Sequence, residues 1–238
     1  MSIQEIPTLR LERELADGGA ELIVGFDEVG RGSLAGPVMV GAAMIRARDL
    51  PSLDVPDGVA DSKMLTERRR EAIYDELKSW CAAWAVGSAS NEEIDAWGIS
   101  HALGVAALRA LAEAERKLGL ADGPIDAGGT QAVRVAGILD GPNDYITKTL
   151  DTFDAPDVPA PARITTLVKA DRHCATVATA AVIAKVTRDR LMVDLARSHP
   201  EWAAYEWEHN KGYGSAAHRA AIAELGPTPL HRVSWKLT

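Results

Sequence analysis

The chain has 238 residues, of which 47% are hydrophobic and 25% are charged, and its formal net charge at pH 7 is −8. This composition excludes a mainly disordered protein, because disordered chains combine low hydrophobicity with high net charge, and no run approaches the roughly 18 apolar residues of a membrane span. The N-terminus lacks the features of a signal peptide and two cysteines cannot form a disulfide framework, so we expect a cytoplasmic protein with no membrane contact.

The charge is unevenly distributed along the chain. Residues 163–238 contain 11 basic and 7 acidic side chains, a balance of +4, whereas the remainder carries −12. The basic C-terminal third can bind a polyanion even though the rest of the chain is acidic. The net charge therefore does not exclude a nucleic-acid partner.

Strands and helices are predicted to alternate. Short apolar runs bounded by turn residues predict strands at 22–28, 38–45, 81–90, 133–140 and 163–171. Helical spacing predicts helices at 66–80, from 91, at 101–118, 173–197 and 215–225, with Thr66, Asn91 and Ser100 as candidate N-caps. Residues 46–65 are predicted to be a loop, and 141–162 an irregular excursion containing a hairpin. This alternation favours the α/β class, with helices packed on one sheet.

Four acidic residues follow apolar runs and precede breaks, so each is expected at a strand end: Asp27, Glu28, Asp140 and Asp171. Carboxylates from the ends of separate strands can meet on one rim, and such oxygen-rich rims suit Mg²⁺ or Mn²⁺. Because neighbouring strand residues point to opposite faces, Asp27 and Glu28 share a site only if the strand turns at Glu28, which Gly30 and Gly32 permit. The alternative is that all four are ordinary acidic residues at the starts of loops.

Five segments carry longer motifs: GFDEVGRGSLAGPVMVGA (25–42), DSKMLTERRRE (61–71), ILDG (138–141), KADRHCATVATAAVIAKVTRDRLM (169–192) and HNKGYGSAAHRAAIAELGPTPLHRVSW (209–235). In sequence and order they resemble bacterial ribonuclease HII, of the type 2 ribonuclease H family, and they span most of residues 22–236. The resemblance implies a ribonuclease H-like fold with a central mixed β-sheet flanked by helices. It implies a single catalytic domain over 1–238, with its core at about 20–197 and a small helical part at about 198–238 that closes over the substrate.

The resemblance also implies the roles of the acids. Asp27, Glu28, Asp140 and Asp171 would be the catalytic, metal-binding residues, holding two divalent ions (Mg²⁺ or Mn²⁺), and Asp189 would be a further acid near the site. The implied enzyme is a monomer that hydrolyses the RNA strand of RNA–DNA hybrids. It also nicks ribonucleotide-containing duplex DNA on the 5′ side of the ribonucleotide, leaving 3′-hydroxyl and 5′-phosphate ends.

Substrate-binding residues follow from the same match. Gly30, Arg31 and Gly32 would form the loop that reads the 2′-hydroxyl, which agrees with the close backbone approach that glycine allows. Tyr213 would stack on the sugar of the adjoining deoxynucleotide. Basic side chains would contact phosphates, which fix register without reading sequence; these are Lys63, Lys185, Arg188 and Lys211.

Some positions depart from the family pattern. Ser33 stands where proline is usual, Ala170 where glycine is usual and Cys174 where serine is usual, and the segment 142–162 is longer than is common. Two alternatives remain open. One is a ribonuclease HIII-like nuclease, which shares an acidic core but lacks the Gly-Arg-Gly loop, and the other is a catalytically silent protein that binds hybrids on the same scaffold.

Overall fold

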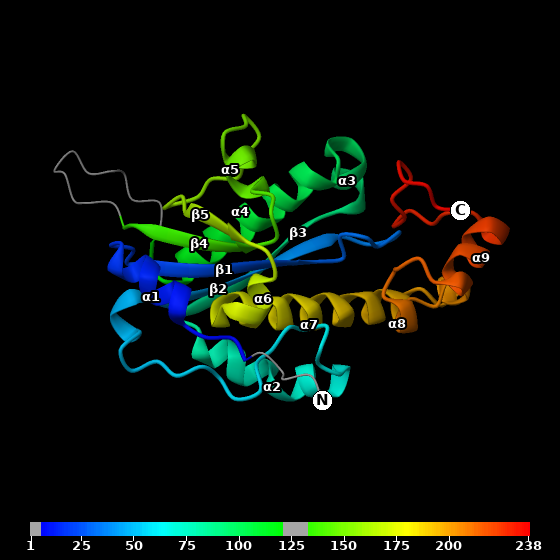
Figure 1. The fold of residues 1–238 in the computed structure, drawn as a ribbon. Helices are drawn as coiled ribbons and strands as arrows, with labels where there is room; N and C mark the ends of the chain where they lie inside the picture. Colours follow the sequence, from blue (N-terminus) through cyan, green and yellow to red (C-terminus); the bar gives the residue numbers. More distant parts are fainter. Residues whose placement is uncertain (1–5, 121–132) are drawn as a thin grey trace.

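A five-stranded mixed sheet lies at the centre of the computed structural model, which describes residues 6–120 and 133–238 (Figure 1). The strands are β1 (Leu22–Val29), β2 (Val38–Arg46), β3 (Ala83–Ala89), β4 (Val135–Asp140) and β5 (Arg163–Leu167). Their order is β3-β2-β1-β4-β5, with β2 antiparallel to both neighbours and β1, β4 and β5 parallel. The predicted α/β class is confirmed, and each predicted strand is present.

Helices cover both faces of the sheet (Figure 1). Val24 and Phe26 of β1 pack into one core with α4 (Ile99–Lys117), whereas Ile23 packs on the other face with α7 (Ala175–Ser198). α7 approaches β1 closely at Gly25, where any side chain would collide with the backbone of residues 176–177 in α7. Burial on both faces explains why β1 and β2 are apolar along almost their whole length.

The other helices are α1 (Arg10–Asp17), α2 (Glu67–Trp80), α3 (Asn91–Trp97), α5 (Tyr145–Leu150), α6 (Ala170–His173), α8 (Trp207–Asn210) and α9 (Ala216–Leu225), and the 3₁₀ turns are η1 (Ala47–Asp49) and η2 (Pro200–Tyr205). Thr66 caps α2 as predicted. Ser90, not Asn91, caps α3, because Glu93 three residues later completes a reciprocal capping box. Ser100 lies inside α4 and caps nothing. No helix in the described ranges is long and apolar enough to cross a membrane.

Two further predictions are wrong. Residues 141–162 form no hairpin: Asp144 accepts hydrogen bonds from the N–H groups of Ile146 and Thr147 and starts α5, which packs on α4 at Gly104. The fifth strand ends at Leu167, and Asp171 lies in the short helix α6 rather than at a strand end. In both places local capping and helical turns replace the extended structure that the sequence suggested.

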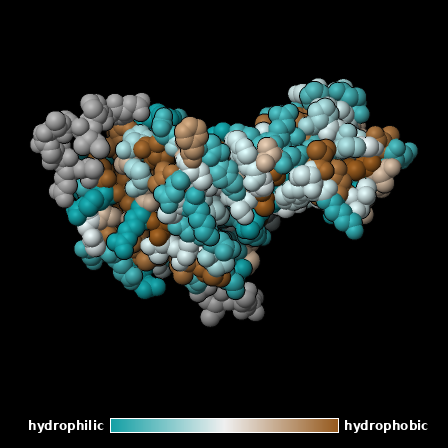
Figure 2. All heavy atoms as spheres, turned by 90° about the horizontal axis from the view of Figure 1, so that it is seen from above, coloured by the Kyte–Doolittle hydropathy of each residue, from teal (hydrophilic) through white to brown (hydrophobic). Residues whose placement is uncertain are grey.

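The chain beyond α7 forms a narrower lobe at one end of the molecule (Figures 1 and 2). Its core contains Tyr205, Trp207 and Ile222, and it also takes in Leu34 and Ala35 from the loop after β1. The C-terminal lobe is therefore packed directly on the loop that leaves the end of β1.

Candidate functional site

Three of the predicted acids lie at one edge of the sheet. Asp27 is on β1, Asp140 ends the neighbouring strand β4, and Asp171 follows β5 in the first turn of α6. The three strands are parallel, so their carboxyl ends meet at the same edge. The Ala170 N–H donates to Oδ1 of Asp140 at 2.7 Å, which ties α6 to the end of β4. Asp27 and Asp171 are 4% and 3% exposed, so both carboxylates are buried.

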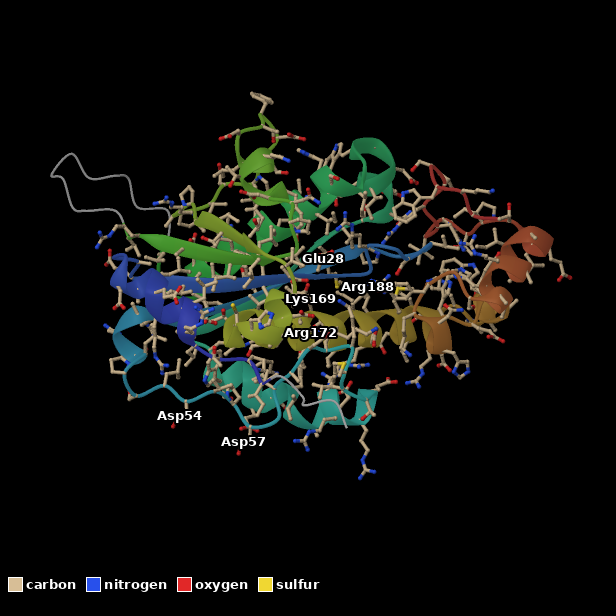
Figure 3. The ribbon with its side chains drawn as sticks, viewed as in Figure 1. Glu28, Asp54, Asp57, Lys169, Arg172 and Arg188 are labelled. Carbon is tan, nitrogen blue, oxygen red and sulfur yellow. The ribbon has the colours of Figure 1, made fainter. Side chains whose placement is uncertain are left out.

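Glu28 lies at the same strand end but on the other face of the sheet. β1 does not turn at Glu28 but continues in register to Val29 opposite Met39. The predicted requirement for a turn is wrong, because Asp27 and Glu28 line one cavity at the end of the strand without it. The carboxylate of Glu28 accepts hydrogen bonds from the hydroxyl of Tyr145 (3.4 Å) and from Arg31 (3.3 Å). Figure 3 shows Glu28 where β1 ends, above α6 and α7. The two neighbouring acids therefore reach the edge from opposite faces.

The acids repel one another. Burial raises the pKa of Asp27 well above its usual range, and the charges of Glu28 and Asp140 raise it further. Burial, then the charges of Asp140 and Asp61, raise the pKa of Asp171 to about 6. Partial burial acts to lower the pKa of Lys63, but the surrounding carboxylates outweigh it and raise that pKa. This edge of the sheet thus holds more negative charge than its own cations balance.

The donor set fits a hard divalent cation. Within residues 6–120 and 133–238, no three Asp, Glu, His or Cys side chains are grouped closely enough to hold a metal ion by themselves. Mg²⁺ does not require such a cage, because it usually keeps several waters and binds through one or two carboxylates together with substrate phosphates. A divalent cation stabilises buried carboxylates whose negative charge is not balanced by neighbouring basic side chains. The residues fit a divalent site that is completed by the substrate.

A cavity of about 260 Å³ opens beside Asp27 and Glu28. Its other lining residues are Val29, Gly30, Arg31, Gly32, Ser62, Lys63, Ala181, Lys185 and Tyr213. The Gly30 N–H donates to the Tyr213 hydroxyl at 3.1 Å, and Tyr213 remains 36% exposed. The structure therefore brings the glycine loop, the tyrosine and two predicted basic residues together beside two of the acids. Asp140 and Asp171 lie outside this lining.

The other predicted basic residues have different surroundings. Arg188 is completely buried and donates to the carbonyls of Ala35, Pro37 and Lys211, so the prediction that it contacts phosphate is wrong. The Lys211 ammonium donates to the Glu208 carbonyl, and only 9% of this residue is exposed. A phosphate contact for Lys211 stays a prediction.

Asp189 belongs to a pairing network. Its carboxylate accepts from Lys185 at 2.8 Å and lies 3.8 Å from Arg70 of α2. Arg70 in turn donates to the carbonyls of Ser62 (2.9 Å) and Leu65. Asp189 therefore helps to hold α2 and the segment that carries Lys63 beside the cavity.

Sequence reasoning missed Asp61. This residue is 4% exposed; it accepts from the Lys63 N–H at 2.9 Å and from Arg172 at 3.3 Å, and its charge acts on Asp171. Its place two residues before Lys63 in the motif was the available signal. Tyr145 was also missed, and no spacing pattern points to it.

Comparison with known proteins agrees with the resemblance seen in the sequence. The ribonuclease HII family profile matches residues 24–238. Ribonuclease HII of Streptomyces avermitilis is 42% identical over 235 residues, which cover 97% of this chain and 84% of that protein.

Solved structures with less than 25% sequence identity share the fold. Ribonuclease H2 of Pyrococcus horikoshii OT3 aligns with a TM-score of 0.58 at 24% identity, covering 91% of this chain and 94% of that one. Bst-RNase HIII in complex with Mn²⁺ aligns with a TM-score of 0.65 at 22% identity, covering 92% and 68%. The predicted ribonuclease H-like fold is confirmed.

Proposed function

Since the chain belongs to the ribonuclease HII family, we propose that it nicks duplex DNA on the 5′ side of embedded ribonucleotides as well as cutting RNA–DNA hybrids. Membership of this family makes it a metal-dependent endoribonuclease of the ribonuclease H type. The proposal adds the embedded-ribonucleotide substrate, a mechanism with two divalent ions, and products with 3′-hydroxyl and 5′-phosphate ends. In the cell this activity removes ribonucleotides from DNA, and we place it in the cytoplasm.

One observation carries the proposal: a carboxylate edge with unbalanced charge lies next to a glycine loop and an exposed tyrosine. Asp27 and Glu28 line the same cavity as Gly30, Gly32 and Tyr213. A polynucleotide seated there has its sugar beside backbone amides and its phosphate beside the acids. Such an arrangement allows an enzyme to select the phosphodiester bond next to a nucleotide that carries a 2′-hydroxyl.

Each group of residues has its own role in this mechanism. Asp27, Glu28, Asp140 and Asp171 would hold two Mg²⁺ or Mn²⁺ ions, which supply an activated water and stabilise the leaving 3′ oxygen. Lys63 and Lys185 line the cavity and neutralise substrate phosphates. Tyr213, fixed by the Gly30 N–H, packs on the sugar of the adjoining deoxynucleotide. The chain needs no covalent intermediate, because water attacks the phosphate directly.

The test is cleavage of end-labelled duplex DNA that contains one ribonucleotide, with Mg²⁺, Mn²⁺ or EDTA, alongside a long RNA–DNA hybrid. We expect metal-dependent nicking of both substrates. Asp140→Asn is expected to abolish nicking without unfolding the protein, because the amide oxygen can still accept from the Ala170 N–H. Asp57→Asn, at an exposed acid far from the site (Figure 3), is the matched control.

Each alternative predicts a different result. Cleavage of the hybrid but not of the single ribonucleotide is the result that a ribonuclease HIII-like specificity predicts. Metal-independent binding without any cleavage is what a silent hybrid-binding protein predicts. Either result would refute the proposed substrate or the proposed reaction, and an active Asp140→Asn variant would refute the site assignment.

A further inference from the structure

Arg232, in the C-terminal lobe, is a completely buried arginine whose hydrogen bonds within the described residues all go to backbone carbonyls. Its Nη2 donates to the carbonyl of Gly30 at 2.7 Å, and its Nη1 donates to that of Arg31 at 2.9 Å. Nε and Nη2 also donate to the Gly36 carbonyl at 3.2 and 3.1 Å. One guanidinium group therefore donates to three backbone carbonyls of the loop that follows β1.

These contacts, together with the Ser33 N–H that donates to the Gly30 carbonyl at 3.2 Å, fix the direction of the loop amides. In a planar trans peptide the C=O and the following N–H point in opposite directions. When the carbonyls of Gly30 and Arg31 turn inward to Arg232, the N–H groups of Arg31 and Gly32 must turn outward. Within residues 6–120 and 133–238 neither N–H has a hydrogen-bond partner in the structure. Both residues line the cavity beside Asp27 and Glu28.

Two successive outward N–H groups can donate to one oxygen atom. The cavity is open beside Gly32 on the side where a side chain would project, because a Cβ added there would have no heavy atom within 4 Å. The cavity therefore leaves room for a substrate oxygen beside these two residues.

The guanidinium group suits this task because its N–H donors lie on three nitrogens in one rigid plane, whereas the three donors of lysine all leave a single nitrogen. Two contacts hold Arg232 in place. Its backbone N–H donates to the Leu34 carbonyl at 2.9 Å, and its guanidinium carbon lies 4.8 Å from the centre of the Trp235 ring. Burial lowers the pKa of Arg232 to about 9, which leaves the group charged at neutral pH. A residue about two hundred positions later in the chain therefore helps to fix the shape of the loop.

We propose that Arg232 is a positioning residue for ribonucleotide recognition: it holds the Arg31 and Gly32 N–H groups outward, where they donate to the 2′-oxygen of the substrate. This inference rests on the proposed function, in which the Gly30–Gly32 loop reads the sugar. Arg232 itself does not touch the nucleic acid.

The test compares two duplexes of one sequence, one all DNA and one with a single ribonucleotide, bound in EDTA so that no cleavage occurs. Fluorescence anisotropy gives the ratio of the two dissociation constants for the wild type, Arg232→Lys and the control Arg219→Lys. Arg219 belongs to the same lobe and also donates to a carbonyl, that of Leu237, but is exposed. Circular dichroism establishes that each variant is folded.

We expect Arg232→Lys to reduce the preference for the ribonucleotide duplex by up to about tenfold, the value of one hydrogen bond. Affinity for the all-DNA duplex should change by less than about twofold, because phosphate contacts are retained, and Arg219→Lys should match the wild type. An unchanged preference, or an equal loss on both duplexes, overturns the role of Arg232. A wild type that shows no preference instead refutes the proposed sugar-reading loop.

If Arg232→Lys does not fold, ¹⁵N-labelled wild-type protein provides the second measurement. The amide resonances of Arg31 and Gly32 should shift on addition of the ribonucleotide duplex and remain in place with the all-DNA duplex. Equal shifts with both duplexes, or no shift with either, would overturn the inference.

Discussion

Replacing Asp171 by asparagine should stabilise the metal-free protein while abolishing its activity. Asp171 is buried beside Asp140 and Asp61, and burial followed by their charges raises its pKa from 3.8 to about 6. A difference of about two pH units corresponds to about 3 kcal/mol of destabilisation once the carboxylate is ionised. Asparagine has the same shape and removes that charge.

The size of the effect depends on pH. Below about pH 4 the carboxyl is protonated in both the folded and the unfolded chain, so the substitution changes little. Between about pH 4 and 6 only the unfolded chain releases the proton, and the stability of the wild type therefore falls as pH rises. Above about pH 6 the full difference applies, and in a chain of this length about 3 kcal/mol raises Tm by about 6 to 12 °C.

The assay is thermal unfolding at pH 4, 6 and 8 in EDTA, and again with Mn²⁺, for the wild type, Asp171→Asn and Asp57→Asn. We expect Asp171→Asn to unfold at a higher temperature than the wild type at pH 8 in EDTA, and at nearly the same temperature at pH 4. Mn²⁺ should raise the Tm of the wild type more than that of Asp171→Asn, because only the wild type gains a full set of ligands. A variant less stable than the wild type at pH 8, or a difference that persists at pH 4, would refute the reasoning.

Further predictions concern substrate preference, helix capping, packing and charge. Tyr213→Ala should slow cleavage at single ribonucleotides more than cleavage of long hybrids, and equal losses in kcat/KM would remove its proposed role beside the sugar. Asp144→Ala deletes the N-cap of α5 and should cost about 1 kcal/mol in urea unfolding; an unchanged midpoint would mean that packing alone holds this helix. Gly25→Ala pushes a methyl group into the α7 backbone and should destabilise the fold by about 1 to 3 kcal/mol or more, which normal stability would contradict. Affinity for the hybrid should fall as salt rises, and a salt-independent Kd would argue against phosphate contacts by Lys63 and Lys185.

The sequence by itself determined the strands, most of the helices and the candidates for the acidic site. Apolar runs such as 22–28 and 38–45 are local patterns. They predict strands buried on both faces of a sheet without any information about the partner strand. Thr66 identified the start of α2 for the same reason, because a cap acts within one turn of the chain. The motif order then linked these acids to one family.

Only the tertiary structure decided how the site is supported. Arg188 looked like a phosphate ligand and Arg232 had no assigned role, yet both are buried and bind carbonyls of the loop after β1. Backbone carbonyls are the same at every residue, so no pattern in the sequence marks which of them a distant side chain will bind. Capping and helix packing likewise placed Tyr145 against Glu28. Local periodicity is encoded in neighbouring residues, whereas contacts between distant segments exist only once the chain has folded.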